Sequence, residues 1–363
     1  MVRIMPDGNY ARMVELKNGN YIAVARNAQG ITYTHSTDKG RTWSVQKPAA
    51  LREEHRSLHN AEIMECSDGT LLLSYSHRPP EDNTTPGLNH TIRVKKSTDG
   101  GHTWGDEIFV FDAGHTRRTG CWEPATLELP SGEIHLYFAN ESVYPTGNDQ
   151  NISLCRSFDK GETWSDPEII SYRQRHRDGM PVPLYLPETK EIIVVIEDNG
   201  WPNHPRRFQP SIIRTTIEDN WRSGTIGAQS LKREFALAEP MDPLDNAGAP
   251  YICRAKTGEI ILSYQTTENR DLPLLNGVKD KDKSQEMGVA VGDEQGRNFT
   301  KRTLPFEIPL GPGGKLPESG NGYQGKWNSL YVDSSGRIWA ITSTNAYGPK
   351  TEIWGITGYL VED

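Results

Sequence analysis

The chain has 363 residues, of which 35% are hydrophobic and 24% charged, a composition typical of a folded globular protein rather than a disordered one. No stretch approaches the roughly 18 consecutive apolar residues of a membrane-spanning helix, and the formal net charge of -8 comes without a long basic run, so neither a membrane nor a nucleic acid is expected as a partner. The start at Met1 lacks the apolar segment of a signal peptide, which predicts a cytoplasmic protein, or a secreted one whose leader has been removed.

Six copies of a hairpin pattern follow one another along the chain. Each copy is an apolar alternating strand, a turn and a second apolar strand. They cover residues 10–25, 60–75, 122–138, 180–196, 249–264 and 327–341. A glycine marks every turn except the fourth, where Lys190 stands instead. The spacing of roughly 50 to 80 residues leaves room for two further strands per copy. The sequence therefore predicts an all-β fold, a single six-bladed β-propeller domain over residues 1–363.

An eight-residue turn, S-x-D-x-G-x-T-W, occurs three times in the first half of the chain, at residues 36–43, 97–104 and 157–164. Its aspartate can accept hydrogen bonds from nearby backbone N–H groups, its glycine can adopt a positive φ, and its tryptophan can pack beneath the turn. Weaker versions stand at 216–221 and 292–299. These turns are expected on the outer rim, with a structural role.

The mouth of the central channel is where a propeller of this kind binds ligands, because the first strand of each blade begins there and the second strand ends there. Two sets of residues fall at this edge. Nine residues before each turn stand Tyr10, Asn60, Glu123, Pro181, Ala249 and Trp327. Seven residues after each turn stand Arg26, Ser76, Ala139, Glu197, Gln265 and Ser343.

Two carboxylates stand out in these sets, Glu123 of the third blade and Glu197 of the fourth. Both follow apolar residues, and burial there would raise a carboxyl pKa. A pair of this kind suits glycoside cleavage, in which one carboxylate attacks or activates water and the other protonates the leaving oxygen. The alternative is that each is an ordinary solvated or ion-paired residue at a strand end.

A polar and aromatic surface is expected around the two glutamates, as sugars require. The predicted substrate-binding residues are Arg12, Asn60, Trp122, Arg78, Arg177, Asp178, Gln265 and Trp327. Tyr323, on a glycine-rich loop before the last inner strand, is a third catalytic candidate, because a phenol there can orient a carboxylate. It can equally be a loop aromatic that packs on its neighbours.

No cofactor or metal is predicted. The four cysteines, Cys66, Cys121, Cys155 and Cys253, lie far apart without the spacing of a zinc site or a disulfide framework, and are expected as buried thiols. No HExxH motif or close carboxylate spacing points to a catalytic metal. The expected partner is an oligo- or polysaccharide substrate, and the expected state is a monomer.

The repeated turns resemble the Asp boxes of the sialidase superfamily. Within that superfamily, residues 121–132 and 137–141 are similar to the W-E-P-F...G...YYSRE stretch of the exo-1,5-α-L-arabinanases, glycoside hydrolase family 93. The R-D-G-M run at 177–180 and the G-A-P run at 248–250 follow in the same order as in that family. Two departures are Ala125, where the family has phenylalanine, and the insertion at residues 271–285, rich in lysine and aspartate.

The resemblance implies an exo-acting, retaining glycoside hydrolase that acts on arabinan or arabino-oligosaccharides, with Glu123 and Glu197 as its catalytic pair and Tyr323 as a tyrosine bonded to one of them. Glu123 is expected to be the nucleophile and Glu197 the acid/base, because a negative charge on the adjacent Asp198 would help keep Glu197 protonated. A sialidase is the nearest rival enzyme, although the arginines it requires are not all at their expected positions. A non-catalytic sugar-binding or protein-binding propeller is the other alternative.

Overall fold

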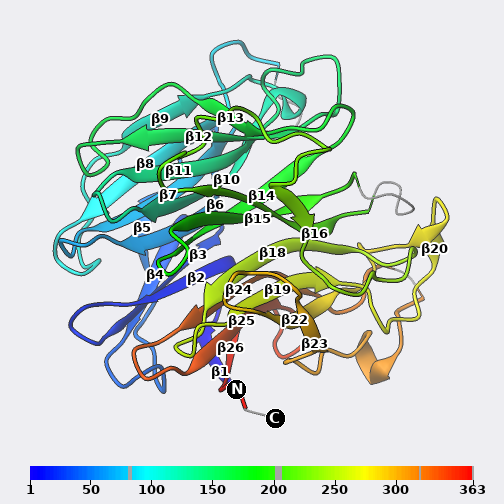
Figure 1. The fold of residues 1–363 in the computed structure, drawn as a ribbon. Helices are drawn as coiled ribbons and strands as arrows, with labels where there is room; N and C mark the ends of the chain where they lie inside the picture. The colour runs from blue at the N-terminus through cyan, green and yellow to red at the C-terminus, as the bar shows by residue number, and fades with distance from the viewer. Residues whose placement is uncertain (81–83, 201–206, 319, 362–363) are drawn as a thin grey trace.

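The computed structural model describes residues 1–80, 84–200, 207–318 and 320–361. Within these ranges the chain forms six four-stranded antiparallel sheets, one two-stranded hairpin and two short 3-10 helices, η1 (Arg117–Thr119) and η2 (Pro312–Gly314). The six sheets stand around a common centre as the blades of a propeller (Figure 1). No helix in the described part is long and apolar enough to cross a membrane.

Each of the first five blades is continuous in sequence, with its first strand at the centre. Blade one contains β2 (Asn9–Glu15), β3 (Tyr21–Asn27), β4 (Gly30–Ser36) and β5 (Lys47–Leu51). Blade two contains β6 (Ser57–Glu65), β7 (Leu71–Arg78), β8 (Thr91–Ser97) and β9 (Ile108–Asp112). Blade three contains β10 (Cys121–Glu128), β11 (Ile134–Asn140), β12 (Asn151–Ser157) and β13 (Glu168–Ser171).

The next two blades follow the same order, with an insertion in the second of them. Blade four contains β14 (Asp178–Leu186), β15 (Glu191–Asp198), β16 (Gln209–Thr216) and β17 (Arg233–Phe235). Blade five contains β18 (Ala247–Arg254), β19 (Ile260–Thr266), β22 (Glu286–Gly292) and β23 (Thr300–Thr303). Its insertion forms the separate hairpin β20 (Leu274–Leu275) and β21 (Val278–Lys279), which projects away from the sheets (Figure 1).

Blade six is assembled from both ends of the chain. It contains β24 (Gly325–Val332), β25 (Ile338–Thr344) and β26 (Glu352–Gly358), and its fourth strand is β1 (Val2–Met5), paired antiparallel with β26. The expectation that two further strands follow every hairpin is therefore wrong for this blade. A strand supplied by the N-terminal segment closes the ring and leaves no open edge on β26.

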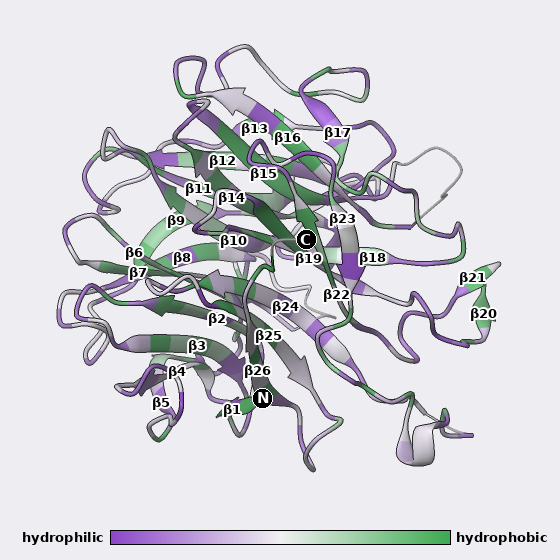
Figure 2. Cartoon of the chain, turned by 60° about the horizontal axis from the view of Figure 1, so that its bottom comes forward, coloured by the Kyte–Doolittle hydropathy of each residue, from purple (hydrophilic) through white to green (hydrophobic). Residues whose placement is uncertain are grey.

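The hydrophobic core is divided among the six interfaces between neighbouring blades. Six clusters of buried side chains each join two adjacent sheets, as Tyr21 of blade one and Trp339 of blade six do with their ring centroids 5.9 Å apart. A seventh, small cluster at the centre contains Tyr10, Met180 and Ala249. Because each sheet packs on both faces, the second strand of a blade is almost entirely buried, as in β7 and β11, and polar residues are frequent in the turns (Figure 2).

The repeated turns join the third and fourth strands of their blades on the rim, as the sequence predicts. In the second one, Asp99 accepts hydrogen bonds from the Thr103 amide at 2.9 Å and the Ser97 hydroxyl at 2.8 Å. Gly101 has a φ of 86°, and a Cβ there would collide with Ile22 of blade one. The weaker versions have the same design, since Asp219 accepts from the Ser223 amide and Asp293 from the Arg297 amide, each at 2.9 Å.

Every inner strand carries a β-bulge near its start, with one residue in the left-handed region. These residues are Tyr10, Asn60, Glu123, Met180, Ala249 and Trp327, with φ between 44° and 59°. The repeat alignment identifies five of the six. It is wrong by one residue in blade four, because β14 has one more residue between its bulge and its turn than β10 has. A bulge breaks the strand ladder, so the amide of the bulge residue needs another partner.

One layer below the bulges, a buried polar group fills the channel. Arg12 donates to Glu62 at 2.8 Å and lies over the ring of Tyr251 at 4.7 Å, and the Tyr251 hydroxyl donates to Glu62 at 3.1 Å. Arg12 is only 1% exposed. The prediction that Arg12 binds substrate is therefore wrong, since its guanidinium is consumed in closing the channel.

We expect Glu62→Gln to lower the free energy of unfolding by about 3–5 kcal/mol, because it leaves the Arg12 charge buried without a partner. Denaturant unfolding measures this. The control is Glu162→Gln, which removes a surface ion pair with Lys96 and is expected to cost less than about 1 kcal/mol. Equal losses in the two variants would contradict the role of the Arg12–Glu62 pair.

Candidate active site

A cavity of about 820 Å³ opens at the end of the channel where the inner strands begin. It lies mainly against blades two, three and four. Its lining residues are Ser57, His59, Arg78, Pro79, Pro80, His90, Arg117, Arg118, Trp122, Glu123, Glu141, Asn148, Gln150, Arg177, Glu197 and Trp327. Both predicted glutamates are therefore at one mouth, from adjacent blades.

The two glutamates are held by the bulges of the next blade. Glu123 accepts a hydrogen bond from the Met180 amide at 3.3 Å, and Glu197 accepts one from the Ala249 amide at 2.9 Å. A Cβ on Gly179 would stand 3.0 Å from a Glu197 oxygen, so the two carboxylates contact consecutive residues, 179 and 180. From ordinary bond lengths, this places them within about 10 Å of each other.

The same arrangement recurs around the ring with neutral acceptors. The carbonyl oxygen of the Gln265 side chain accepts from the Trp327 amide at 2.9 Å, and the Ser343 hydroxyl accepts from the Tyr10 amide at 3.0 Å. In blade three the corresponding residue is Ala139, whose side chain has no hydrogen-bond acceptor. The Met180 amide therefore donates to Glu123 instead. Gln265 thus supports the position of Trp327 and does not line the cavity, contrary to its prediction as a substrate-binding residue.

Burial changes the ionisation of both glutamates. Burial, and then the negative charge of Glu197, raises the pKa of Glu123 to about 7, although Arg78 acts against this. Burial also raises the pKa of Glu197, but the Ala249 amide and the charges of Lys281 and Arg177 oppose the shift. The negative charge of Glu197 thus favours the protonated form of Glu123.

Lys281 comes from the blade-five insertion that the sequence left without a role. Its ammonium lies 5.4 Å from the ring centre of Phe208, which packs beside Gly248 near Glu197. The Gln285 amide donates to the Lys281 carbonyl at 2.7 Å, and the Gln265 amide donates to Gln285 at 2.8 Å. The insertion is thus hydrogen-bonded to the same ring of bulges that holds the glutamates.

Four of the predicted binding residues do line the cavity. Arg78 stacks over the Trp122 ring at 4.5 Å, and the Trp122 indole donates to Glu141 at 3.0 Å. Arg177 donates to Glu141 at 2.5 Å, and Trp327 lies on the far side of Glu123. Asn60 is behind this wall, where its side-chain oxygen accepts from Arg78.

Asp178 and Asp198 are not in the cavity. Both are fully buried on the other side of the blade-four sheet, where each pairs with Arg233, and Asp198 also with Arg173 at 2.9 Å. Asp178 is therefore wrong as a binding residue. Asp198 gives no support for a protonated Glu197, because two arginines neutralise its charge and its side chain lies on the opposite face of the strand.

The prediction that Tyr323 lies beside the catalytic glutamates is also wrong. Its side chain packs against the apolar cluster between blades five and six, which includes Phe306 and Ile308, and is absent from the cavity lining. The alternative interpretation, that Tyr323 is a loop aromatic packed on its neighbours, is therefore correct. The charge of Glu123 acts instead on Tyr10, whose pKa is raised chiefly by burial; Arg12 opposes this shift and Glu123 adds to it.

Sequence reasoning missed several lining residues, chiefly Glu141, Gln150, Arg117 and Arg118. Glu141 is two residues beyond Ala139, and the Gln150 amide donates to its carboxylate at 3.0 Å. Glu141 directly follows the end of a second strand, and this position could have predicted that it lies at the channel mouth. The two arginines belong to η1 in a long connection, where no repeat gives a register.

One group of described residues has the spacing of metal ligands, Glu53, His77 and Glu107, with ligand atoms within 4.8 Å of one another. Glu107 already accepts from the Tyr75 hydroxyl at 2.5 Å and interacts with His77 at 3.2 Å. None of these residues lines the cavity that contains Glu123 and Glu197.

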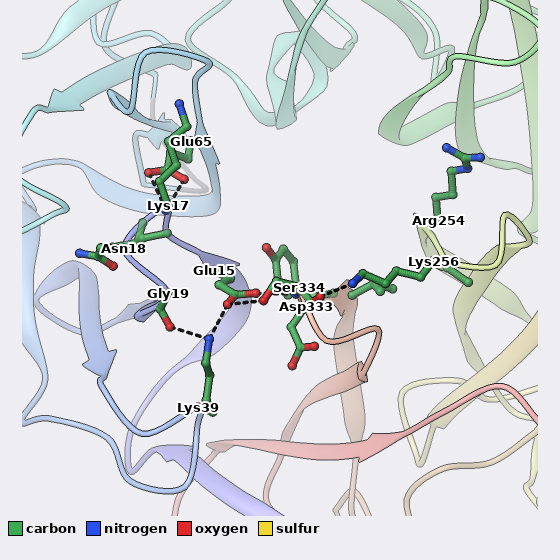
Figure 3. A pocket seen from close by; sticks show the side chains of 14 residues that line it. Glu15, Lys17, Asn18, Gly19, Lys39, Glu65, Arg254, Lys256, Asp333 and Ser334 are labelled. Carbon is green, nitrogen blue, oxygen red and sulfur yellow. Dashed lines mark hydrogen bonds and ion pairs between the residues drawn. The ribbon is translucent and has the colours of Figure 1, made fainter.

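The opposite end of the channel has a second hollow, of about 810 Å³ (Figure 3). Its charged groups bond mainly to one another: Lys39 donates to Glu15 at 2.7 Å, the Ser334 hydroxyl donates to Glu15 at 2.8 Å, and the Lys17 amide donates to Glu65 at 3.0 Å. These contacts tie the turns of neighbouring blades together. The hollow is therefore part of the packing between blades.

Comparison with known proteins agrees with this architecture. Residues 89–183 match the BNR repeat-like domain. This match lies within blades two to four of the six-bladed propeller. A sialidase of Vibrio cholerae serotype O1 is 26% identical to it over 185 residues, which are 46% of this chain and 22% of the sialidase. The propeller thus matches only about a fifth of the length of that relative.

Two solved structures have the same fold over nearly their whole length. An α-L-arabinanase of Penicillium chrysogenum, in complex with arabinobiose, has a TM-score of 0.64 at 19% identity, covering 98% of this chain and 94% of its own. An α-L-arabinofuranosidase of Fusarium graminearum, also with arabinobiose, has a TM-score of 0.63 at 17% identity, covering 99% and 97%. At these identities the likeness establishes the fold of the propeller.

We expect Glu123→Gln to raise the Tm by a few degrees at pH 8 and to change it little at pH 4.5. The raised pKa means that folding favours the protonated acid, so this stabilisation is present below the unfolded pKa and is lost as the pH rises through about 7. Glutamine mimics the protonated form at every pH. Calorimetry across this range measures the difference, with the exposed Glu218→Gln as the control. A pH-independent effect would contradict the raised pKa.

Proposed function

We propose that this propeller is a glycoside hydrolase in which Glu123 and Glu197 cleave the glycosidic bond. The observation that carries the proposal is the placement of two half-buried carboxylates in one cavity, where the charge of Glu197 favours the protonated form of Glu123. Separated ionisation states are what an acid and a nucleophile need at the same pH. The names of the sialidase relative and the arabinanase neighbours support the same reaction class.

We assign the nucleophile to Glu197 and the acid/base to Glu123, the reverse of the roles expected from the sequence. Lys281, Arg177 and the Ala249 amide favour the ionised form of Glu197. Glu123 would protonate the leaving oxygen as Glu197 attacks the anomeric carbon, and would then take a proton from the water that releases the sugar. The proposed outcome is retention, which requires the two carboxyl groups to be roughly 5 Å apart so that Glu197 can form a covalent glycosyl intermediate.

For the substrate we propose arabinan or arabino-oligosaccharides, cleaved from a chain end. Trp122 and Trp327 offer apolar rings for stacking on sugar faces, and the cavity volume is in the usual range for small-molecule sites. The two arabinanase-type neighbours support this choice by their extensive structural match. A sialidase is the second candidate, favoured by the arginines in the lining and by the relative from Vibrio cholerae.

We expect both Glu123→Gln and Glu197→Gln to lower kcat on debranched arabinan by about 100- to 10,000-fold. A nitrophenyl arabinofuranoside, whose leaving group needs little protonation, should restore much of the first step in Glu123→Gln and none in Glu197→Gln. Glu218→Gln is again the matched control. The roles are reversed if the activated substrate restores the first step in Glu197→Gln alone, and the mechanism is wrong if neither variant loses activity.

The pH profile of kcat/KM gives a separate test. It should fall above about pH 7, where Glu123 loses its proton. Lys281→Met removes a charge that lowers the pKa of Glu197, so the acidic limb should move to higher pH, whereas Lys283→Met, in the same insertion, should leave it in place. An acidic limb that does not move in Lys281→Met would contradict the role given to the insertion.

A further inference from the structure

A smaller cavity of about 260 Å³ adjoins the larger one on the side of blades one and two. Its lining residues are Asn9, Tyr10, Arg26, His59, Asn60, Arg78, Glu123 and Trp327. His59, Arg78, Glu123 and Trp327 border both cavities. We call the smaller cavity the basic lobe, because two arginines face it against a single carboxylate.

The two arginines of the basic lobe have no carboxylate partner in the described part of the chain. The Arg26 side chain makes no hydrogen bond or ion pair there, and its buried Nε atom has no acceptor. Arg78 donates only to neutral groups, the Asn60 side chain and the Ser76 hydroxyl, the latter at 3.4 Å. Glu123 is the only acid that borders the lobe, and no ion pair within 4.0 Å joins it to either arginine.

Other buried arginines of this protein are treated differently. Five of them form an ion pair with a carboxylate: Arg12, Arg156, Arg214, Arg233 and Arg270. A buried guanidinium without a counter-charge is costly, because it has lost its hydration and gained no attraction in return. The lobe therefore lacks a negative group of the kind that these five arginines have.

The electrostatics of the lobe agree with this geometry. Burial lowers the pKa of Arg26, and burial lowers the pKa of Arg78 to about 10, with the charge of Arg26 acting in the same direction. Burial, and then the charges of Arg78 and Arg26, lowers the pKa of His59 to about 2. A protein with a net charge of -8 thus presents a concentrated positive charge beside its catalytic candidates.

We propose that the basic lobe binds the carboxylate of a uronic acid residue in the substrate, adjacent to the sugar that is cleaved. Guanidinium groups match a planar carboxylate in geometry as well as charge. The side chain of Asn9 is available for hydroxyl groups, and Trp327 for an apolar sugar face. The position next to the cleaved sugar rests on the proposed function, whereas the binding of an acidic sugar does not.

An acidic sugar in the basic lobe leaves the space between the two glutamates free for the sugar that reacts. The lobe begins beside Glu123 and extends away from Glu197, toward Asn9 and Arg26. A neutral pentose can therefore occupy the space between the two glutamates while an acidic neighbour occupies the lobe. The substrate predicted by this arrangement is an acidic glycan.

The test is the binding of sugars that differ only in the acid group, measured by NMR titration of the wild-type protein. The probes are D-glucuronate, its methyl ester and D-glucose, and the matched galacturonate series. We expect each free acid to bind at least tenfold more tightly than its ester and its neutral sugar, and to lose this advantage as salt is raised. Equal affinities within a series, or inorganic sulfate binding as tightly as the acids, would overturn the proposal.

Variants then locate the preference. Arg78→Met and Arg26→Met should each reduce the preference for the acid about tenfold, and Arg78→Lys should retain part of it. Arg93→Met is the matched control, since Arg93 is in the same blade but stacks on Phe109 outside the lobe. An unchanged preference in the Arg26→Met/Arg78→Met double variant would overturn the site.

The two proposals fail separately. Acid preference without any hydrolysis would leave the lobe in place and remove the hydrolase, whereas hydrolysis of arabinan without acid preference would do the reverse. If the arginine variants do not fold, the comparison of acid and ester on the wild-type protein still decides the question.

Discussion

The bulge in each inner strand is the constraint that connects this fold to its chemistry. A left-handed residue takes one backbone N–H out of the strand ladder, and a buried amide without an acceptor is costly. Four of these amides are satisfied by side chains at the cavity edge: Ser343, Gln265, Glu197 and Glu123. Where the acceptor is a carboxylate, satisfying the backbone also fixes an acid at the channel mouth.

The repetition of the bulges at one register explains how much of the fold and of the site could be predicted from the sequence. The hairpins and rim turns are local, so their residues carry the pattern within a few positions of one another. Glu123 and Glu197 were found because the repeats share a register. The fourth strand of blade six was not found, because β1 (Val2–Met5) pairs with a segment about 350 residues away and nothing nearby records that pairing.

The wrong assignments have a common physical origin, since a register gives a position along a strand but not the direction of its side chain. Asp178 follows Arg177 in sequence yet lies on the other face of the sheet, where Arg233 neutralises it. Arg12 is two residues past a bulge and points into the channel below. Tyr323 depended on a loop, and a loop has no periodicity from which a direction can be derived.

The closure of blade six also bears on how the molecule is made. Because β1 pairs with β26 (Glu352–Gly358), about 350 residues later in the sequence, β1 stays without its partner until β26 has been translated. Until blade six is complete, the ring is open, and blades one and five each leave uncovered the face that packs against blade six. The pairing of β1 with β26 is therefore the contact that closes the ring of blades, and removing β1 would leave the edge of β26 unpaired.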